Sequence, residues 1–191
     1  MQSKKGDDPM KRTITNPVFE DEVRFVTTAE ESDGEVTELE ITLKPGGEND
    51  LHYHQTYAET FTAVEGRLGV RLGPKGVEHI LEPGQSKVVD EGQIHAFFNP
   101  TDADITFKVE LKPGHTGFEQ SLRIMYGLAH DGEVNAQGMP KSLKNMGVIA
   151  RLSEMRSPNR ILRLLEPLIL WLGKRAEKDG TKEELLDRYC R

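Results

Sequence analysis

Cysteine, long apolar runs and an excess of positive charge are scarce or missing in this sequence of 191 residues. Its only cysteine is Cys190, so no intrachain disulfide can form and a reducing compartment is the simpler expectation. No stretch approaches the roughly 18 consecutive apolar residues that a membrane-spanning helix requires. The opening residues MQSKKGDDPMKR have no apolar segment behind their lysines. We therefore expect a soluble, cytoplasmic protein.

The chain has 25 Lys or Arg and 32 Asp or Glu, so its formal net charge is -7. This balance argues against a general nucleic-acid-binding protein. Apolar residues make up 36% of the chain and charged residues 30%, which is typical of a globular protein with a well-hydrated surface. A chain of this length suits one main domain with an appendage.

Short runs of β-branched and aromatic residues fill the chain up to residue 115 and are separated by turns of Gly, Pro and Asp. This pattern predicts an antiparallel sandwich or barrel. In TELEITL, Leu39, Ile41 and Leu43 alternate with Glu38 and Glu40, so one face can be buried while the other stays in water. The expected strands are 23–29, 37–43, 59–66, 67–73, 77–81, 86–89, 94–98 and 105–111.

The apolar period changes from two to about 3.6 after residue 115, which predicts helices. A first helix runs along FEQSLRIMYGLAHDG and ends at Gly132. Ser157 and Pro158 are typical N-cap and first-turn residues of a second helix, and KEELLDRY predicts a third. The chain is therefore divided into a flexible N-terminus (1–11), a β-rich domain (12–115) and a helical extension (116–191).

The second helix of the extension has one apolar side, because Ile161, Leu164, Leu165, Leu168 and Leu172 recur at helical spacing. Pro167 should bend or interrupt it. Seven Lys or Arg and three Glu between residues 151 and 178 give that segment a charge of +4, which leaves -11 for the remainder. Such a helix can lie on an anionic membrane surface, but we favour packing on the β-rich domain or on a second subunit.

A histidine pair near the middle of the chain is the strongest chemical signal. His52 and His54 are one residue apart, so on an extended segment both imidazoles point to the same side and can reach one ion. Glu59 has the wrong parity to join them unless the chain turns or bulges within 55–58. His95, just after a glycine turn, is the best candidate for a fourth ligand from a distant strand.

The spacing around these residues resembles the two motifs of the cupin family. Gly46, His52, His54, Glu59 and Gly66 match the first motif, GGENDLHYHQTYAETFTAVEG. The second motif is matched by Gly84, Gly92, His95 and Asn99. One position departs from it, because Asp90 stands where the cupin pattern usually has proline, a residue that shapes a turn and binds no metal. The resemblance covers residues 12–115.

A cupin is a jelly-roll barrel, and the resemblance implies a mainly β fold in which His52, His54, Glu59 and His95 converge. Such sites commonly hold one divalent transition metal: iron, manganese, nickel, copper or zinc. Two open metal positions would suit an enzyme of the dioxygenase type that acts on a small organic molecule. Glu59 is also a candidate general base. Cupins of this kind are commonly homodimers. The expected pocket residues are Tyr57, Phe61, Ala63, Phe97 and Asn99.

Two other functions remain open for this ligand set. A cupin can bind or sense a small molecule without turnover, or it can catalyse another reaction, such as isomerisation at a zinc site or decarboxylation of an oxalate-like acid. A cation beside the ligands would favour catalysis, and the candidates for that role are Arg71 and Lys87. The remaining histidines, His79, His115 and His130, are expected to be ordinary surface residues.

Overall fold

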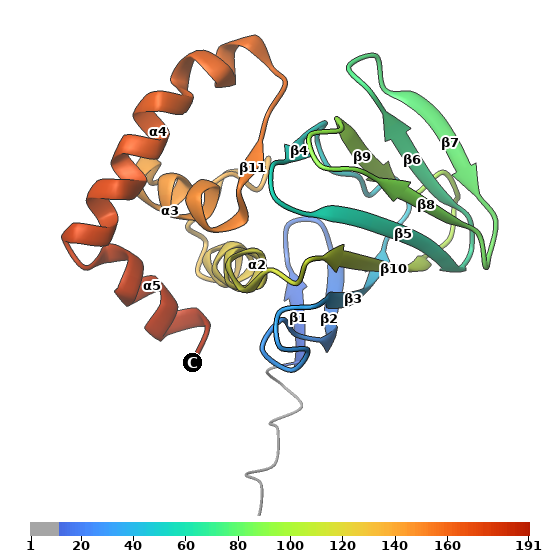
Figure 1. Ribbon diagram of the computed structural model, residues 1–191, viewed down its shortest axis with the longest axis horizontal. Coiled ribbons are helices and arrows are strands. Elements are labelled where there is room, and N and C mark those ends of the chain that lie inside the picture. The colour runs from blue at the N-terminus through green and yellow to red at the C-terminus, as the bar shows by residue number, and fades with distance from the viewer. Residues whose placement is uncertain (1–11) are drawn as a thin grey trace, which may run out of the picture.

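The computed structural model describes residues 12–191 (Figure 1). The expected flexible N-terminus, 1–11, lies outside the described residues. Ten strands fill the first part of the chain. They are β1 (Thr13–Asn16), β2 (Asp21–Thr27), β3 (Thr37–Leu43), β4 (Tyr53–His54), β5 (Ala58–Glu65), β6 (Leu68–Leu72), β7 (Val77–Leu81), β8 (Ser86–Val89), β9 (His95–Phe98) and β10 (Ile105–Lys112).

Helices dominate the second part of the chain, and Figure 1 shows them gathered on one side of the strands. Among residues 12–191, none of the helices has both the length and the apolar content to cross a membrane. The elements after residue 115 are α2 (Thr116–His130), α3 (Leu143–Ser153), β11 (Met155–Arg156), α4 (Arg160–Lys178) and α5 (Thr181–Tyr189).

The strands form an antiparallel jelly roll. One sheet has the order β1-β2-β3-β10-β5-β8 and the other the order β7-β6-β9, while β4 pairs with β11. All eight strands expected from the sequence form within a few residues of their predicted ends. The alternation in β3 is confirmed, because Leu39, Ile41 and Leu43 are buried while their neighbours are not. The fold is therefore mainly β with a C-terminal helical region.

Two apolar cores hold the chain together. The larger core lies between the sheets and includes Phe25, Phe61 and Phe107. The smaller core lies among the helices and includes Ile124 and Val148. Met125 of α2 packs against both cores, so the helical extension is joined to the barrel through apolar contacts.

The predicted start of α4 is wrong, and Pro167 does not interrupt the helix. Its N-cap is Asn159, whose side chain accepts hydrogen bonds from the backbone N–H groups of Ile161 and Leu162, so the helix begins after the Ser157–Pro158 pair. The helix also continues through Pro167 without interruption. Proline has no backbone N–H, so Pro167 cannot donate the helical hydrogen bond to the carbonyl of Arg163. Because Arg163 is exposed, water can donate to that carbonyl instead.

Candidate metal centre

The two histidine segments lie side by side because their backbones pair. The N–H of His52 donates to the carbonyl of His95 at 2.9 Å, and the N–H of His95 donates to the carbonyl of His52 at 2.8 Å. Gly92, with a φ of +74°, forms the turn before His95 and donates its N–H to the carbonyl of His54 at 2.7 Å. The motif residues are thus held at fixed positions by main-chain hydrogen bonds.

Glu59 reaches the histidines because the chain breaks between two strands. Strand β4 ends at His54 and β5 begins at Ala58, so residues 55–57 supply the irregular segment that the parity argument required. On β5, Glu59 lies opposite Leu111 of β10 and Val89 of β8. Its side chain therefore points to the same interior as these buried residues.

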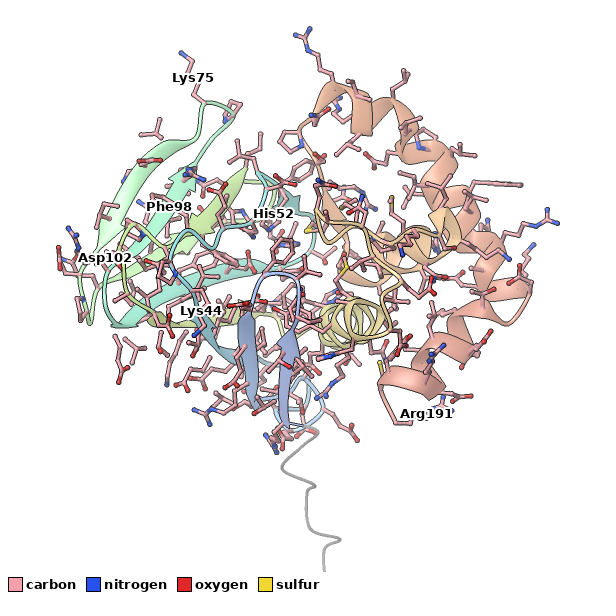
Figure 2. The ribbon with its side chains drawn as sticks, turned by 180° about the vertical axis from the view of Figure 1, so that it is seen from behind. Lys44, His52, Lys75, Phe98, Asp102 and Arg191 are labelled. Carbon is pink, nitrogen blue, oxygen red and sulfur yellow. The ribbon has the colours of Figure 1, made fainter. Side chains whose placement is uncertain are left out.

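Four side chains from these segments form one buried cluster. His52, His54, Glu59 and His95 each place a ligand atom within 4.8 Å of the others. Nε2 of His95 lies 2.6 Å from Oε2 of Glu59, and Nε2 of His54 lies 3.4 Å from the same oxygen. Figure 2 shows His52 in the part of the barrel nearest to the helical extension. His52 is the most exposed of the four at 8%, so the cluster is nearly sealed from solvent.

Backbone carbonyls orient two of the imidazoles. Nδ1 of His52 lies 2.8 Å from the carbonyl oxygen of Asp50, and Nδ1 of His95 lies 2.9 Å from that of Gln93. A carbonyl can only accept, so in both rings Nδ1 carries the proton and donates. In the neutral ring the lone pair is then on Nε2, which points into the cluster.

The third imidazole is oriented by a tyrosine and by the helical extension. The hydroxyl of Tyr57 donates to the carbonyl of Ser153 at 2.9 Å and lies 2.6 Å from Nδ1 of His54. Because its one proton is used on Ser153, the hydroxyl accepts from Nδ1–H of His54. The rings of His54 and Tyr57 are also stacked, with centroids 4.5 Å apart. The end of α3 thus fixes the tautomer of His54 through Tyr57.

Strand β11 reinforces this connection. Met155 and Arg156 pair with His54 and Tyr53, so the extension adds a short strand to the one that carries His54. The chain reaches this pairing through Glu154, which adopts a left-handed φ of +52° and accepts a hydrogen bond from the hydroxyl of Thr56. The helical extension is therefore part of the wall that surrounds the cluster.

The charges of the cluster favour an ionised carboxylate at Glu59 and a neutral imidazole at His52. Burial raises the pKa of Glu59, but the facing imidazoles of His54 and His95 outweigh it and hold that pKa below its usual range. Burial and the neighbouring histidines lower the pKa of His52 to about 3. For His95, burial lowers the pKa, but nearby Glu59 outweighs burial and raises it.

Three ligand atoms of the cluster make no hydrogen bond among residues 12–191: Nε2 of His54, Oε2 of Glu59 and Nε2 of His95. A buried polar atom without a partner costs roughly 1–3 kcal/mol, so native proteins rarely keep three together. A divalent cation would satisfy all of them, because neutral Nε2 atoms and a carboxylate oxygen are metal ligands. The residues present therefore fit a bound metal ion.

The five expected pocket residues differ in what they contact. Phe61 and Ala63 are 1% exposed and belong to the barrel core. The ring of Phe61 lies 5.7 Å from that of His95 and 6.1 Å from that of Phe97. Tyr57 is buried beside His54. The side chain of Asn99 bonds the backbones of Leu43, Thr101 and Ala103, so it fixes a turn.

Of the two candidate cations, neither forms an ion pair with the cluster. Arg71 pairs with Glu48 and Glu78 and lies over the ring of Phe98, which places it on the outer face of its sheet. Lys87 is opposite Phe61 in the β5–β8 register and is half-buried, so it points inward.

Asp90 stands where the cupin motif usually has proline. Its backbone N–H donates a hydrogen bond to the side chain of Gln93, a contact that proline could not make.

Sequence reasoning missed two partly or fully buried residues that tie the extension to this region. His115 is half-buried instead of being an ordinary surface residue, because its Nδ1 caps α2 by accepting the N–H of Phe118 at 2.9 Å. Glu119 of α2 accepts hydrogen bonds from the N–H of Ala29 at 2.7 Å and from the hydroxyl of Thr37 at 2.5 Å. The position of His115 after Pro113 and Gly114 was the available signal for a cap.

Residues 39–117, from β3 to the start of α2, match the family model of the cupin domain. This segment is therefore a cupin domain, and the resemblance of the two motifs is confirmed. The match includes all four residues of the cluster and ends before the part of the extension that contacts Tyr57. A comparison with curated protein sequences gives no match.

Several solved structures are similar to the barrel. A sugar phosphate isomerase from a cupin superfamily, from Silicibacter pomeroyi, is 23% identical over 52% of this chain and 69% of its own, with a TM-score of 0.45. A predicted oxalate decarboxylase from Thermotoga maritima is 19% identical over 49% and 80%, with a TM-score of 0.46. An RmlC-like cupin from Shewanella frigidimarina is 19% identical over 61% and 97%, with a TM-score of 0.48.

Proposed function

We propose that His52, His54, Glu59 and His95 hold one divalent transition metal ion and that this protein is an enzyme acting on a small organic molecule there. The observation that supports the proposal is the set of unpaired ligand atoms inside the barrel. Nε2 of His54, Nε2 of His95 and Oε2 of Glu59 face one another without hydrogen bonds in the described part of the chain. Structural zinc sites are usually closed by cysteines, whereas a mixed nitrogen and oxygen set is typical of catalytic metals.

The ion would supply Lewis acidity and, in the case of iron, manganese or copper, a redox-active centre. The three imidazoles would bind it through Nε2, because their Nδ1 atoms are engaged elsewhere. Glu59 would balance part of its charge. The low pKa of Glu59 favours the role of ligand over that of general base, because a weakly basic carboxylate takes up a proton less readily.

Aromatic side chains beside the cluster would exclude water from the reacting molecule. The ring of Phe61 lies near those of both His95 and Phe97, and the rings of Phe97 and Phe107 have centroids 5.1 Å apart. Such walls suit a small substrate and strengthen electrostatic contacts to its polar groups. Dioxygenase-like chemistry is our preferred reading. Turnover-free binding and a zinc-dependent isomerisation are the alternatives, and the metal found at the site directs the assays that distinguish them.

Elemental analysis of the wild-type protein, purified without chelator, tests the proposal. We expect about one transition metal ion per chain, as one four-ligand site predicts. Iron, manganese or copper would direct the next step to oxygen-uptake assays with small organic acids and phenols, and zinc to isomerisation assays. Protein that stays empty after incubation with each of these metals would contradict the proposal and favour ligand binding by a metal-free barrel.

Removing one hydroxyl should weaken the metal site without removing a ligand. Tyr57→Phe keeps the ring that stacks on His54 but deprives Nδ1–H of its acceptor and the Ser153 carbonyl of its donor. We expect metal affinity to fall about 10–100-fold, the usual effect of losing a hydrogen bond behind a ligand. Competition with a chromophoric chelator measures the affinity.

Tyr126→Phe is the matched control for that change. Tyr126 is also buried and its hydroxyl also donates a hydrogen bond, at 2.5 Å, but to Asp21 rather than to a cluster residue. The control should bind metal as the wild type does. Equal affinities of Tyr57→Phe and the wild type would show that the Tyr57 hydroxyl does not position His54.

A further inference from the structure

We propose that α4 attaches this protein to an anionic membrane surface. In this arrangement the helix lies parallel to the surface and places one apolar side among the lipid headgroups. The inference concerns a face of the helical extension and is independent of the metal site. The apolar side, called the α4 stripe below, consists of Ile161, Leu164, Leu165, Leu168 and Trp171.

The α4 stripe is the most exposed apolar surface of the extension. Leu164 is 81% exposed, Ile161 70% and Trp171 54%. The five residues occupy positions i, i+3, i+4, i+7 and i+10, so they share one side of the helix. A stripe of large apolar side chains left in water is unfavourable, at roughly 25 cal/mol for each Å², and therefore marks an interaction site.

Within residues 12–191, no other segment of the chain covers the stripe. The end of α4 packs on α3 through a different side, where Gly173 and Ala176 are buried and Gly173 approaches Gly147 closely. Figure 1 shows α4 along the outer edge of the extension, on the side away from the strands. The packing on the barrel that the sequence favoured therefore does not involve these side chains.

Five cations accompany the stripe and keep their charge available. Within residues 12–191 none of them forms an ion pair, whereas Glu166 and Glu177 of the same helix are paired with Arg156 and Arg151. The helix therefore presents unneutralised positive charge although the chain as a whole is acidic. The five are Arg160, Arg163, Lys174, Arg175 and Lys178.

This charge favours a lipid surface over a second copy of the chain. Pairing of two stripes about a two-fold axis would bring ten unpaired cations of two α4 helices into one interface, where like charges repel. Anionic headgroups attract the same cations while the stripe enters the interfacial layer. Trp171 suits this position because indole prefers the boundary between hydrocarbon and water, and Arg175 lies over its ring at 5.7 Å.

Trp171 also provides the measurement, because it is the only tryptophan of the chain. We expect its fluorescence to shift to shorter wavelength when the full-length protein meets vesicles of equimolar phosphatidylglycerol and phosphatidylcholine, and not with pure phosphatidylcholine. The protein should sediment with the first vesicles only, and salt should release it because screening weakens the attraction. Light scattering of the vesicle-free protein gives its oligomeric state in parallel.

Two pairs of variants separate the contributions of charge and stripe. Arg160→Gln with Arg163→Gln should lower vesicle affinity about 25-fold, at about fivefold for each cation, while Arg67→Gln with Lys75→Gln, on exposed barrel turns, should not. Leu164→Ser with Leu168→Ser should abolish the fluorescence shift. Val77→Ser with Val88→Ser, at two exposed positions of the barrel, should leave it unchanged.

Three results would overturn the inference. Equal binding to both kinds of vesicle would show that the cations of α4 do not determine membrane binding. If Trp171 is exposed to water and the protein does not bind vesicles, α4 does not attach the protein to a membrane. A dimer whose Trp171 is already shielded in buffer, and whose dimerisation is lost in Leu164→Ser with Leu168→Ser, would assign the stripe to a second copy of the chain.

Discussion

A variant carrying His52→Ala and His54→Ala is expected to contain no metal under conditions in which the wild-type protein contains about one ion per chain. Removing both imidazoles leaves Glu59 and His95, and two ligands do not hold a divalent ion against water. The measurement is metal content by mass spectrometry after identical purification, supported by melting curves with and without added metal. The wild type should melt at a higher temperature with metal, and the variant should not respond.

The variant with His79→Ala and His130→Ala is the control, because it also loses two histidines. His79 is half-buried on β7 and His130 is exposed at the end of α2, and neither belongs to the cluster. This control should keep its metal. If both double variants lose metal equally, the ion was held by surface histidines, and if both keep it, the ion is bound elsewhere in the protein.

Replacing Gly147 by alanine is expected to destabilise the protein by about 3 kcal/mol, the upper part of the range for overpacking. A Cβ on Gly147 would lie 2.5 Å from the backbone nitrogen of Gly173 and 2.5 Å from the carbonyl oxygen of Ile169. Both atoms belong to the backbone of α4, so α3 and α4 would have to move apart. Urea unfolding followed by circular dichroism measures the free energy of unfolding.

The sign of this effect is diagnostic. Alanine in place of glycine normally stabilises a helix by about 1 kcal/mol, so a loss of stability can only come from the contact with α4. Leu143→Ala, at an exposed position of the same helix, should change the free energy of unfolding little. A Gly147→Ala protein as stable as the wild type would show that α3 and α4 do not need this close approach.

The sequence predicted the barrel and the cluster well because both rest on local patterns. Alternation within each strand defines which side is buried. The spacings of His52, His54, Glu59 and His95 can be recognised in the sequence without knowledge of tertiary contacts. The requirement for a break between His54 and Glu59 also followed from parity alone. The alternation and the break are encoded within a few residues, whereas His95 lies on a distant strand and was predicted from its position in the second motif.

The remaining features depend on contacts between distant segments. Strands β4 and β11 have two residues each, too few for any periodic signal, and exist because they pair with each other. Helix α3 was not predicted, since Gly147 lowers its helix propensity and the reason for that glycine, the approach of α4, lies outside the segment. The bond of Tyr57 to Ser153 spans 96 residues and has no sequence signature.

That hydrogen-bond chain, from Ser153 through Tyr57 to His54, has a consequence for how the protein can change over evolutionary time. The compositional boundary at residue 115 suggests two modules that could be inherited or exchanged separately. These hydrogen bonds cross this boundary, so a substitution or insertion in α3 or β11 can alter the position of His54 in the candidate metal centre while all four cluster residues stay the same. Selection on the geometry of the cluster would therefore act on both modules together, and a barrel paired with a foreign extension would need a new acceptor for the Tyr57 hydroxyl.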